Sequence, residues 1–112
     1  TDPALAPPIR SLVVWDSNPA ATVPDQLRLR EGLMRDDLAI TVLEQRLTDT
    51  ALLADVVLPA TMQPEHLDIH RSYGHHYLAL NEPAVAAAGQ CLPNTEIFRR
   101  LAAALRAACR GR

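Results

Sequence analysis

The side chains best suited to bind a ligand lie in two short polar segments, each of which directly follows an apolar run. A carboxylate such as that of Glu44 can accept hydrogen bonds from two adjacent N–H donors at once. Guanine offers such a pair at N1 and its exocyclic amino group, whereas adenine presents an acceptor at N1 that would repel a carboxylate. Glu44 is therefore a candidate selector of guanine. The candidate site residues, all polar or turn-forming, are Asp16, Ser17, Asn18, Pro19, Glu44 and Thr48.

Several of these polar residues also have a purely structural interpretation. Glu44 could be a solvated acid at the end of a strand, because acidic residues are mostly exposed. Asn18 could be a plain turn residue before Pro19, since asparagine is common in turns. For Asp55 we favour a structural role, in which its carboxylate hydrogen-bonds the preceding turn.

Three apolar runs must position these side chains, and each is predicted to be a strand. They cover residues 11–15, 38–43 and 56–58. The last run is apolar without interruption, which is typical of a strand covered on both faces, and Pro59 ends it because proline has no N–H for the ladder. The alternation of strands and helices predicts an α/β fold with an open, mostly parallel sheet and helices on both faces. Residues 77–80 could add a fourth strand.

The first predicted helix connects the first two strands and covers residues 22–35. Thr22 can cap it and Pro24 fits its first turn. Glu31 and Arg35 are spaced to form an ion pair on its exposed side. Such a crossover would bring the ends of both strands to one edge of the sheet, beyond which ligands of these folds lie.

The second predicted helix covers residues 94–109, with Asn94 as its cap and Gly111 as its terminator. Its apolar stripe would pack on the sheet. The stripe consists of Ile97, Leu101, Leu105 and Ala108.

Three features in this order and spacing are specific: Ser-Asn-Pro at 17–19, the pattern TxTAxxADVVLP at 48–59, and Glu65 shortly afterwards. From residue 9 to 105 the chain resembles the molybdopterin-dependent oxidoreductases of the dimethyl sulfoxide reductase type. The resemblance implies that residues 10–110 are a Rossmann-like domain of a larger enzyme. The prolines in residues 1–9 indicate a linker or a cut end rather than a folded element. This domain would help hold one guanosine end of the bis(molybdopterin guanine dinucleotide) cofactor, and its partners would be other domains of the same enzyme.

The resemblance also implies roles for single residues. Asn18 would lie against the nucleotide, Glu44 would recognise the guanine base, and Thr48 would sit beside Glu44. Many relatives carry aspartate where this chain has Glu44, and the chain after Glu65 departs further from the family pattern, which leaves subfamily and substrate open. We expect no catalytic residue in this part of the enzyme, so that it is not catalytic alone.

Composition excludes several other classes of protein. The net charge is −2 and all eleven basic residues are arginine without a basic stripe, so nucleic-acid binding is not expected. No apolar run approaches the roughly 20 residues of a membrane span, and the N-terminus lacks a signal-peptide core. The compartment stays open, with the cytoplasm favoured. Two distant cysteines outside any CxxC give no sign of a zinc or iron–sulfur site.

Four histidines, His66, His70, His75 and His76, crowd one segment, and their role is open. His66 and His70 are four residues apart, the spacing at which two imidazoles on a helix can share a metal. However, HEXXH is absent and no third ligand is evident, so we expect no metal site and favour a polar loop facing a neighbouring domain or cofactor cleft. Two alternatives to the cofactor-binding hypothesis remain: a free-standing Rossmann-like binding or interaction module, and a small metalloprotein built on these histidines.

Overall fold

The computed structural model describes residues 6–111. The chain divides into two compact units, Thr1–Leu58 and Pro59–Arg112. Residues 6–9 of the predicted linker form no helix or strand, and its residues 1–5 lie outside the described part. The predicted domain limits at 10 and 110 stay a prediction.

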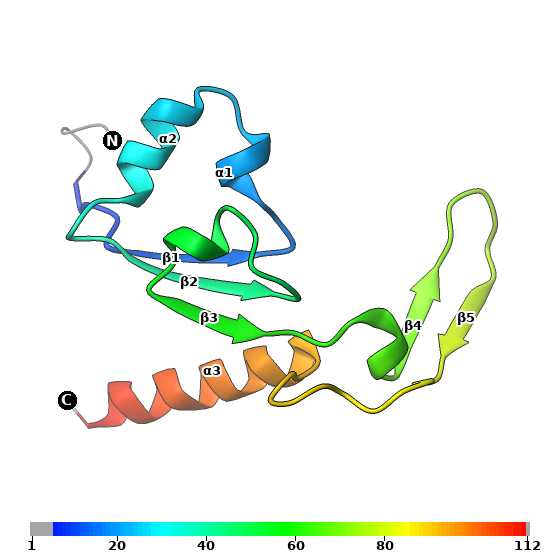
Figure 1. The fold of residues 1–112 in the computed structure, drawn as a ribbon. Coiled ribbons are helices and arrows are strands. Elements are labelled where there is room, and N and C mark those ends of the chain that lie inside the picture. The colour runs from blue at the N-terminus through cyan, green and yellow to red at the C-terminus, as the bar shows by residue number, and fades with distance from the viewer. Residues whose placement is uncertain (1–5, 112) are drawn as a thin grey trace. The chain divides into compact units, whose positions relative to one another are not determined.

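The first unit is built on a sheet of three strands in the order β1-β2-β3. Strands β1 and β2 are parallel, with Ser11 beside Ala39 and Trp15 beside Leu43, and β3 runs in the same direction (Figure 1). The predicted α/β class with a parallel sheet is confirmed. The elements are β1 (Ser11–Trp15), α1 (Pro19–Thr22), α2 (Gln26–Leu33), β2 (Ala39–Glu44), the 3-10 helix η1 (Ala51–Leu53) and β3 (Val56–Pro59).

The hydrophobic core of this unit lies on one face of the sheet. Side chains alternate along a strand, so Val14 points into this core while its neighbours Val13 and Trp15 are 51% and 52% exposed. Figure 1 shows α1 and α2 on the same side of the sheet. Burial of one such aliphatic side chain stabilises the fold by about 1.5–3 kcal/mol. The core residues are Val14, Ala20, Leu33, Ile40, Val42 and Ala51.

The prediction that the third strand is covered on both faces is wrong for Val56, which is 48% exposed. An uninterrupted apolar run does not by itself reveal which face finds a covering layer. Coverage of both sheet faces by helices, and with it the Rossmann-like topology, remains a prediction.

The connection from β1 to β2 forms two helices rather than the single helix predicted for residues 22–35. Thr22 closes α1 instead of capping a new helix, because its Oγ1 donates to the Asn18 carbonyl at 2.9 Å. Asp25 then adopts a left-handed conformation with φ 58°, and α2 begins after it at Gln26. Thr22 as the cap of the crossover helix was therefore a wrong prediction.

The predicted ion pair between Glu31 and Arg35 is replaced by another. Helix α2 ends at Leu33, so Arg35 lies beyond the helical spacing that would bring it near Glu31. Instead its guanidinium donates to both carboxylate oxygens of Asp37 at 2.8 and 2.7 Å. This hydrogen bonding lowers the pKa of Asp37 below its usual value.

The second unit combines a hairpin with a long helix. Strands β4 and β5 pair antiparallel, with Ile69 beside Leu80. The predicted strand at 77–80 thus exists at 78–81, but it is not a fourth strand of the parallel sheet, because its backbone groups pair with the preceding strand across a turn at Gly74, where φ is 86°. The elements are the 3-10 helix η2 (Gln63–Glu65), β4 (Asp68–Arg71), β5 (Leu78–Asn81) and α3 (Asn94–Arg110).

Helix α3 begins one residue earlier than a cap at Asn94 would allow. Pro93 occupies the cap position, and its carbonyl accepts the N–H groups of Glu96 and Ile97 at 2.9 and 3.0 Å. Asn94 lies inside the helix, and its Oδ1 has no hydrogen-bond partner among the described residues. The cap prediction was wrong, whereas the end before Gly111 is confirmed. Within residues 6–111, no helix has the length and apolar character needed to cross a membrane.

Candidate functional site

The register of β1 and β2 determines which polar residues share an edge. Trp15 lies beside Leu43. The next residues along the chain are Asp16, which directly follows β1, and Glu44, which is the last residue of β2. Both strands are parallel, and their carboxyl ends therefore open onto the same edge of the sheet. The turn 16–18 and Glu44 lie at that edge, which is the one where ligands of open parallel sheets are found.

The turn after β1 changes the direction of the chain over three residues. Asp16 has φ 53°, in the left-handed region that aspartate tolerates better than most side chains. Asp16 and Ser17 are exposed, while Asn18 is half-buried. The Asn18 carbonyl accepts the N–H groups of Ala21 and Thr22 at 3.0 and 3.1 Å, and Pro19 opens α1.

The Asn18 side chain is tied to Thr50, a residue of the loop that follows β2. Its Oδ1 accepts hydrogen bonds from the Thr50 backbone N–H at 3.1 Å and from the Thr50 hydroxyl at 2.8 Å. The same hydroxyl oxygen accepts the Ala20 N–H at 3.0 Å. These bonds join the turn after β1, the start of α1 and the loop after β2.

Glu44 ends β2 and is half-exposed. Its Oε1 accepts one hydrogen bond, from the N–H of the next residue, Gln45, at 2.8 Å. A carboxylate has about four acceptor positions, so Glu44 retains the capacity to accept from a ligand. This capacity is what selection of guanine would require.

Thr48 has a structural contact of its own. Its Oγ1 accepts the Ala51 N–H at 3.3 Å, and its carbonyl accepts the Leu52 N–H at 2.9 Å. Thr48 therefore connects the loop after β2 to the first two residues of η1. Its predicted position beside Glu44 in a cofactor-binding site stays a prediction.

Two residues of this region were missed at the level of sequence: Thr50 and Arg30. Arg30 donates to the Ala20 carbonyl at 3.1 Å and lies 3.5 Å from the Asp49 carboxylate. It therefore connects α2 both to α1 and to the loop after β2. Thr50 is part of the TxTA pattern, which was the available signal. Nothing local in the sequence marks its contact with Asn18, because the two residues are 32 positions apart.

Asp55 has a structural role, as predicted, but with a different partner. Its Oδ2 accepts the Ile40 N–H at 2.7 Å, and its own N–H donates to the Ile40 carbonyl at 3.0 Å. Asp55 thus connects the start of β3 to the start of β2 rather than to the preceding turn.

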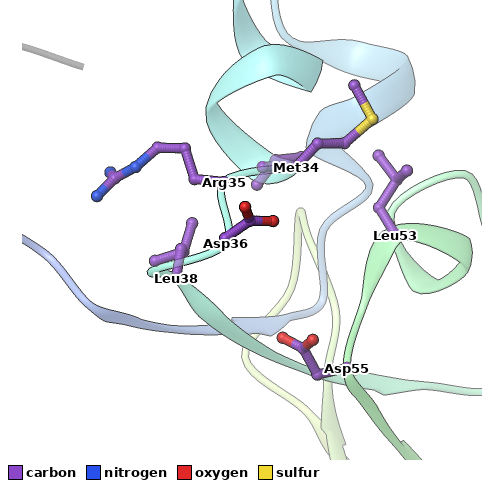
Figure 2. A pocket seen from close by; sticks show the side chains of 7 residues that line it. Met34, Arg35, Asp36, Leu38, Leu53 and Asp55 are labelled. Carbon is purple, nitrogen blue, oxygen red and sulfur yellow. The ribbon is translucent and has the colours of Figure 1, made fainter.

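A pocket of about 300 Å³ lies at the opposite edge of the sheet (Figure 2). Leu38 and Asp55 mark this position, because they directly precede β2 and β3. The pocket is therefore separate from the edge that carries Asn18 and Glu44. Its lining residues are Leu33, Met34, Arg35, Asp36, Leu38, Leu53 and Asp55.

The helical spacing considered for His66 and His70 does not occur, because residues 68–71 form strand β4. The His66 Nδ1 lies 2.9 Å from both Thr61 Oγ1 and the Met62 carbonyl, which anchors the imidazole inside its own unit. The His70 Nε2 lies 3.1 Å from Gln63 Nε2. Across residues 6–111, no three His, Cys, Asp or Glu side chains are grouped to hold a metal ion.

The amino-acid sequence is similar to that of other proteins over most of its length. Residues 6–104 match the family described as molybdopterin oxidoreductase. The "Probable oxidoreductase YoaE" of Bacillus subtilis (strain 168) is 46% identical over 99 residues, which cover 88% of this chain and 15% of that protein. The "Probable oxidoreductase YyaE" of the same organism is 30% identical over 100 residues, again 88% of this chain and 15% of the relative. This chain, which spans 15% of the length of these two relatives, belongs to the molybdopterin oxidoreductase family.

Proposed function

We propose that this chain forms one wall of the cofactor site of an oxidoreductase and holds the guanosine part of a molybdopterin guanine dinucleotide. Membership of the family implies a molybdopterin cofactor, and the guanine form is our inference from the residues. The observation that carries it is the position of Asn18 and Glu44 at one carboxyl edge of the parallel sheet.

The donor and acceptor groups at this edge fit the guanosine group. The half-exposed Glu44 carboxylate can accept from guanine N1–H and the exocyclic amino group. The Asn18 amide oxygen is occupied by Thr50, so the amide NH₂ is the group that Asn18 would offer to a ribose or phosphate oxygen.

The molybdopterin, when bound, would carry the metal that performs the redox chemistry. The residues of this chain would bind and orient the nucleotide end, and none of them is assigned a catalytic role. Other domains of the same polypeptide would complete the site. Because a single wall provides only part of the contacts of an enclosed ligand, this chain alone should bind weakly.

Titration of the isotope-labelled chain with GDP, followed by nuclear magnetic resonance, tests this proposal because the method detects weak binding. We expect GDP to shift the amide signals of residues 16–18 and 44–48, and ADP to shift them much less. A hydrogen bond to a charged group contributes about 1.5–3 kcal/mol, so Glu44→Gln should reduce the preference for GDP about tenfold or more.

The matched control is Glu31→Gln, which removes an exposed carboxylate of α2 and should leave the GDP preference unchanged. Signal changes confined to residues outside the two loops, or equal responses to GDP and ADP in the parent chain, would contradict the proposed function.

A further inference from the structure

We propose that Thr50 is a positioning residue, which holds Asn18 in the orientation that presents its amide NH₂ to the nucleotide. This inference rests on the proposed function and adds to it a residue that touches no ligand itself.

The environment of Thr50 is the first support. Thr50 has 0% of its surface exposed, so its hydroxyl cannot satisfy its hydrogen-bonding capacity with solvent. A buried hydroxyl without hydrogen-bond partners is unfavourable. The Thr50 hydroxyl both donates and accepts a hydrogen bond. It donates to Asn18 Oδ1 at 2.8 Å and accepts from the Ala20 N–H at 3.0 Å.

The second support is that two donors converge on one oxygen of Asn18. The Thr50 backbone N–H, at 3.1 Å, can only donate and therefore requires an acceptor at this position, and the Thr50 hydroxyl, at 2.8 Å, donates to the same oxygen. An amide flipped by 180° would direct its NH₂ at the Thr50 N–H, so that donor would face donor. Thr50 therefore determines which end of the Asn18 amide points away from the protein.

The third support is the location of the two residues. Asn18 is in the turn after β1, and Thr50 is in the loop after β2, directly before η1. The contact spans 32 positions of the chain and joins the two loops that carry the candidate site. A substitution at Thr50 would thus change the conformation of the turn 16–18 without any contact between Thr50 and the ligand.

Binding of GDP to the full chain carrying Thr50→Val tests the inference, with Thr50→Ser as the conservative variant. Valine matches the shape of threonine but has no hydroxyl, whereas serine keeps the hydroxyl. Since one hydrogen bond contributes about a three- to tenfold change in an equilibrium constant, Thr50→Val should weaken GDP binding by about that factor. Thr50→Ser should bind GDP close to the parent chain.

A double-mutant cycle separates positioning from a general effect on the fold. If Thr50 acts through Asn18, the chain carrying both Asn18→Ala and Thr50→Val should bind GDP no more weakly than Asn18→Ala alone. The side-chain NH₂ signals of Asn18 give a second measurement, and they should move in Thr50→Val but not in Thr50→Ser.

The outcomes separate the two proposals. Failure of the parent chain to distinguish GDP from ADP would overturn the proposed function and, with it, this inference. GDP selectivity in the parent combined with unchanged affinity in Thr50→Val, or with additive losses in the double variant, would overturn only the role of Thr50. If Thr50→Val does not fold, Thr50→Ser decides: a tenfold loss of affinity there would contradict a role carried by the hydroxyl.

Discussion

The Asp55 carboxylate accepts the backbone N–H of Ile40 at 2.7 Å, while the Asp55 N–H donates to the Ile40 carbonyl at 3.0 Å. This reciprocal pair connects two strands at the edge of the sheet opposite the candidate site. It occurs at the point where η1 has ended and β3 begins, so it fixes where the third strand joins the second.

Replacement of Asp55 should reveal the strength of this connection. Asp55→Ala leaves the Ile40 N–H without its partner, and a lost partner of a partly buried donor costs about 1–3 kcal/mol of unfolding free energy. Asp55→Asn keeps an oxygen acceptor and should cost less. Urea unfolding, followed by the fluorescence of the single tryptophan, Trp15, measures the difference.

Asp36→Ala is the control for Asp55, because Asp36 is an exposed aspartate of the same pocket wall. Surface substitutions of this kind change stability by about 0.5 kcal/mol or less. Equal losses for Asp36→Ala and Asp55→Ala would mean that the contact with Ile40 contributes nothing specific.

The stability of helix α3 should change with pH as the carboxyl group of Glu96 gains or loses its proton. Hydrogen bonds from Arg99 and Arg100 lower the pKa of Glu96 from 4.5 to about 2. A carboxyl group with a depressed pKa in the folded state stabilises that state above its unfolded pKa and loses this contribution as the pH falls. The stabilisation should therefore be present above pH 4.5 and disappear between 4.5 and about 2, and it is small because exposed ion pairs are screened by solvent.

A carbon-detected titration of Glu96 measures this pKa directly. The double change Arg99→Met and Arg100→Met should raise the midpoint toward 4.5, the ordinary value of the group. Arg106→Met, on a later turn of the same helix, should leave it unchanged. A midpoint near 4.5 in the parent chain would refute the proposed effect of the two arginines.

The stability of the β4–β5 hairpin should depend on the side chain of Asn81. The Asn81 NH₂ group donates to the carbonyls of Gln63 and His66 at 2.8 and 2.9 Å, which attaches β5 to η2 and to the residue directly after it. Asn81→Ala should accelerate amide hydrogen exchange in β4 and β5 about three- to tenfold, the effect of a lost hydrogen bond. Asn81→Asp should accelerate it more, because a carboxylate would face two carbonyl oxygens.

Exposed Glu82, the residue after the hairpin, provides the comparison. Glu82→Ala should leave hydrogen exchange in β4 and β5 as it is in the parent chain. If Asn81→Ala also leaves it unchanged, the hairpin is held by its own ladder and the side chain of Asn81 does not secure it.

The amino-acid sequence by itself determined the strands of the parallel sheet and the family. Runs of apolar residues and a terminating proline are local features, and the ends of the observed strands differ from those predicted by at most one residue. The motifs around Asn18 and Thr48 pointed to the family that residues 6–104 match. The turn 16–18 and Glu44 could be assigned to one edge because parallel strands share their carboxyl ends.

The contacts that shape the candidate site were decided only by the tertiary structure. Thr50 and Asn18 meet because the pairing of β1 with β2 brings together loops that are 32 residues apart. The pairing of β5 with β4 likewise settled the place of a strand whose apolar residues would have suited either sheet. Local sequence patterns restrict the conformation of the backbone, whereas the partner of a buried polar group depends on which distant segment folding brings beside it.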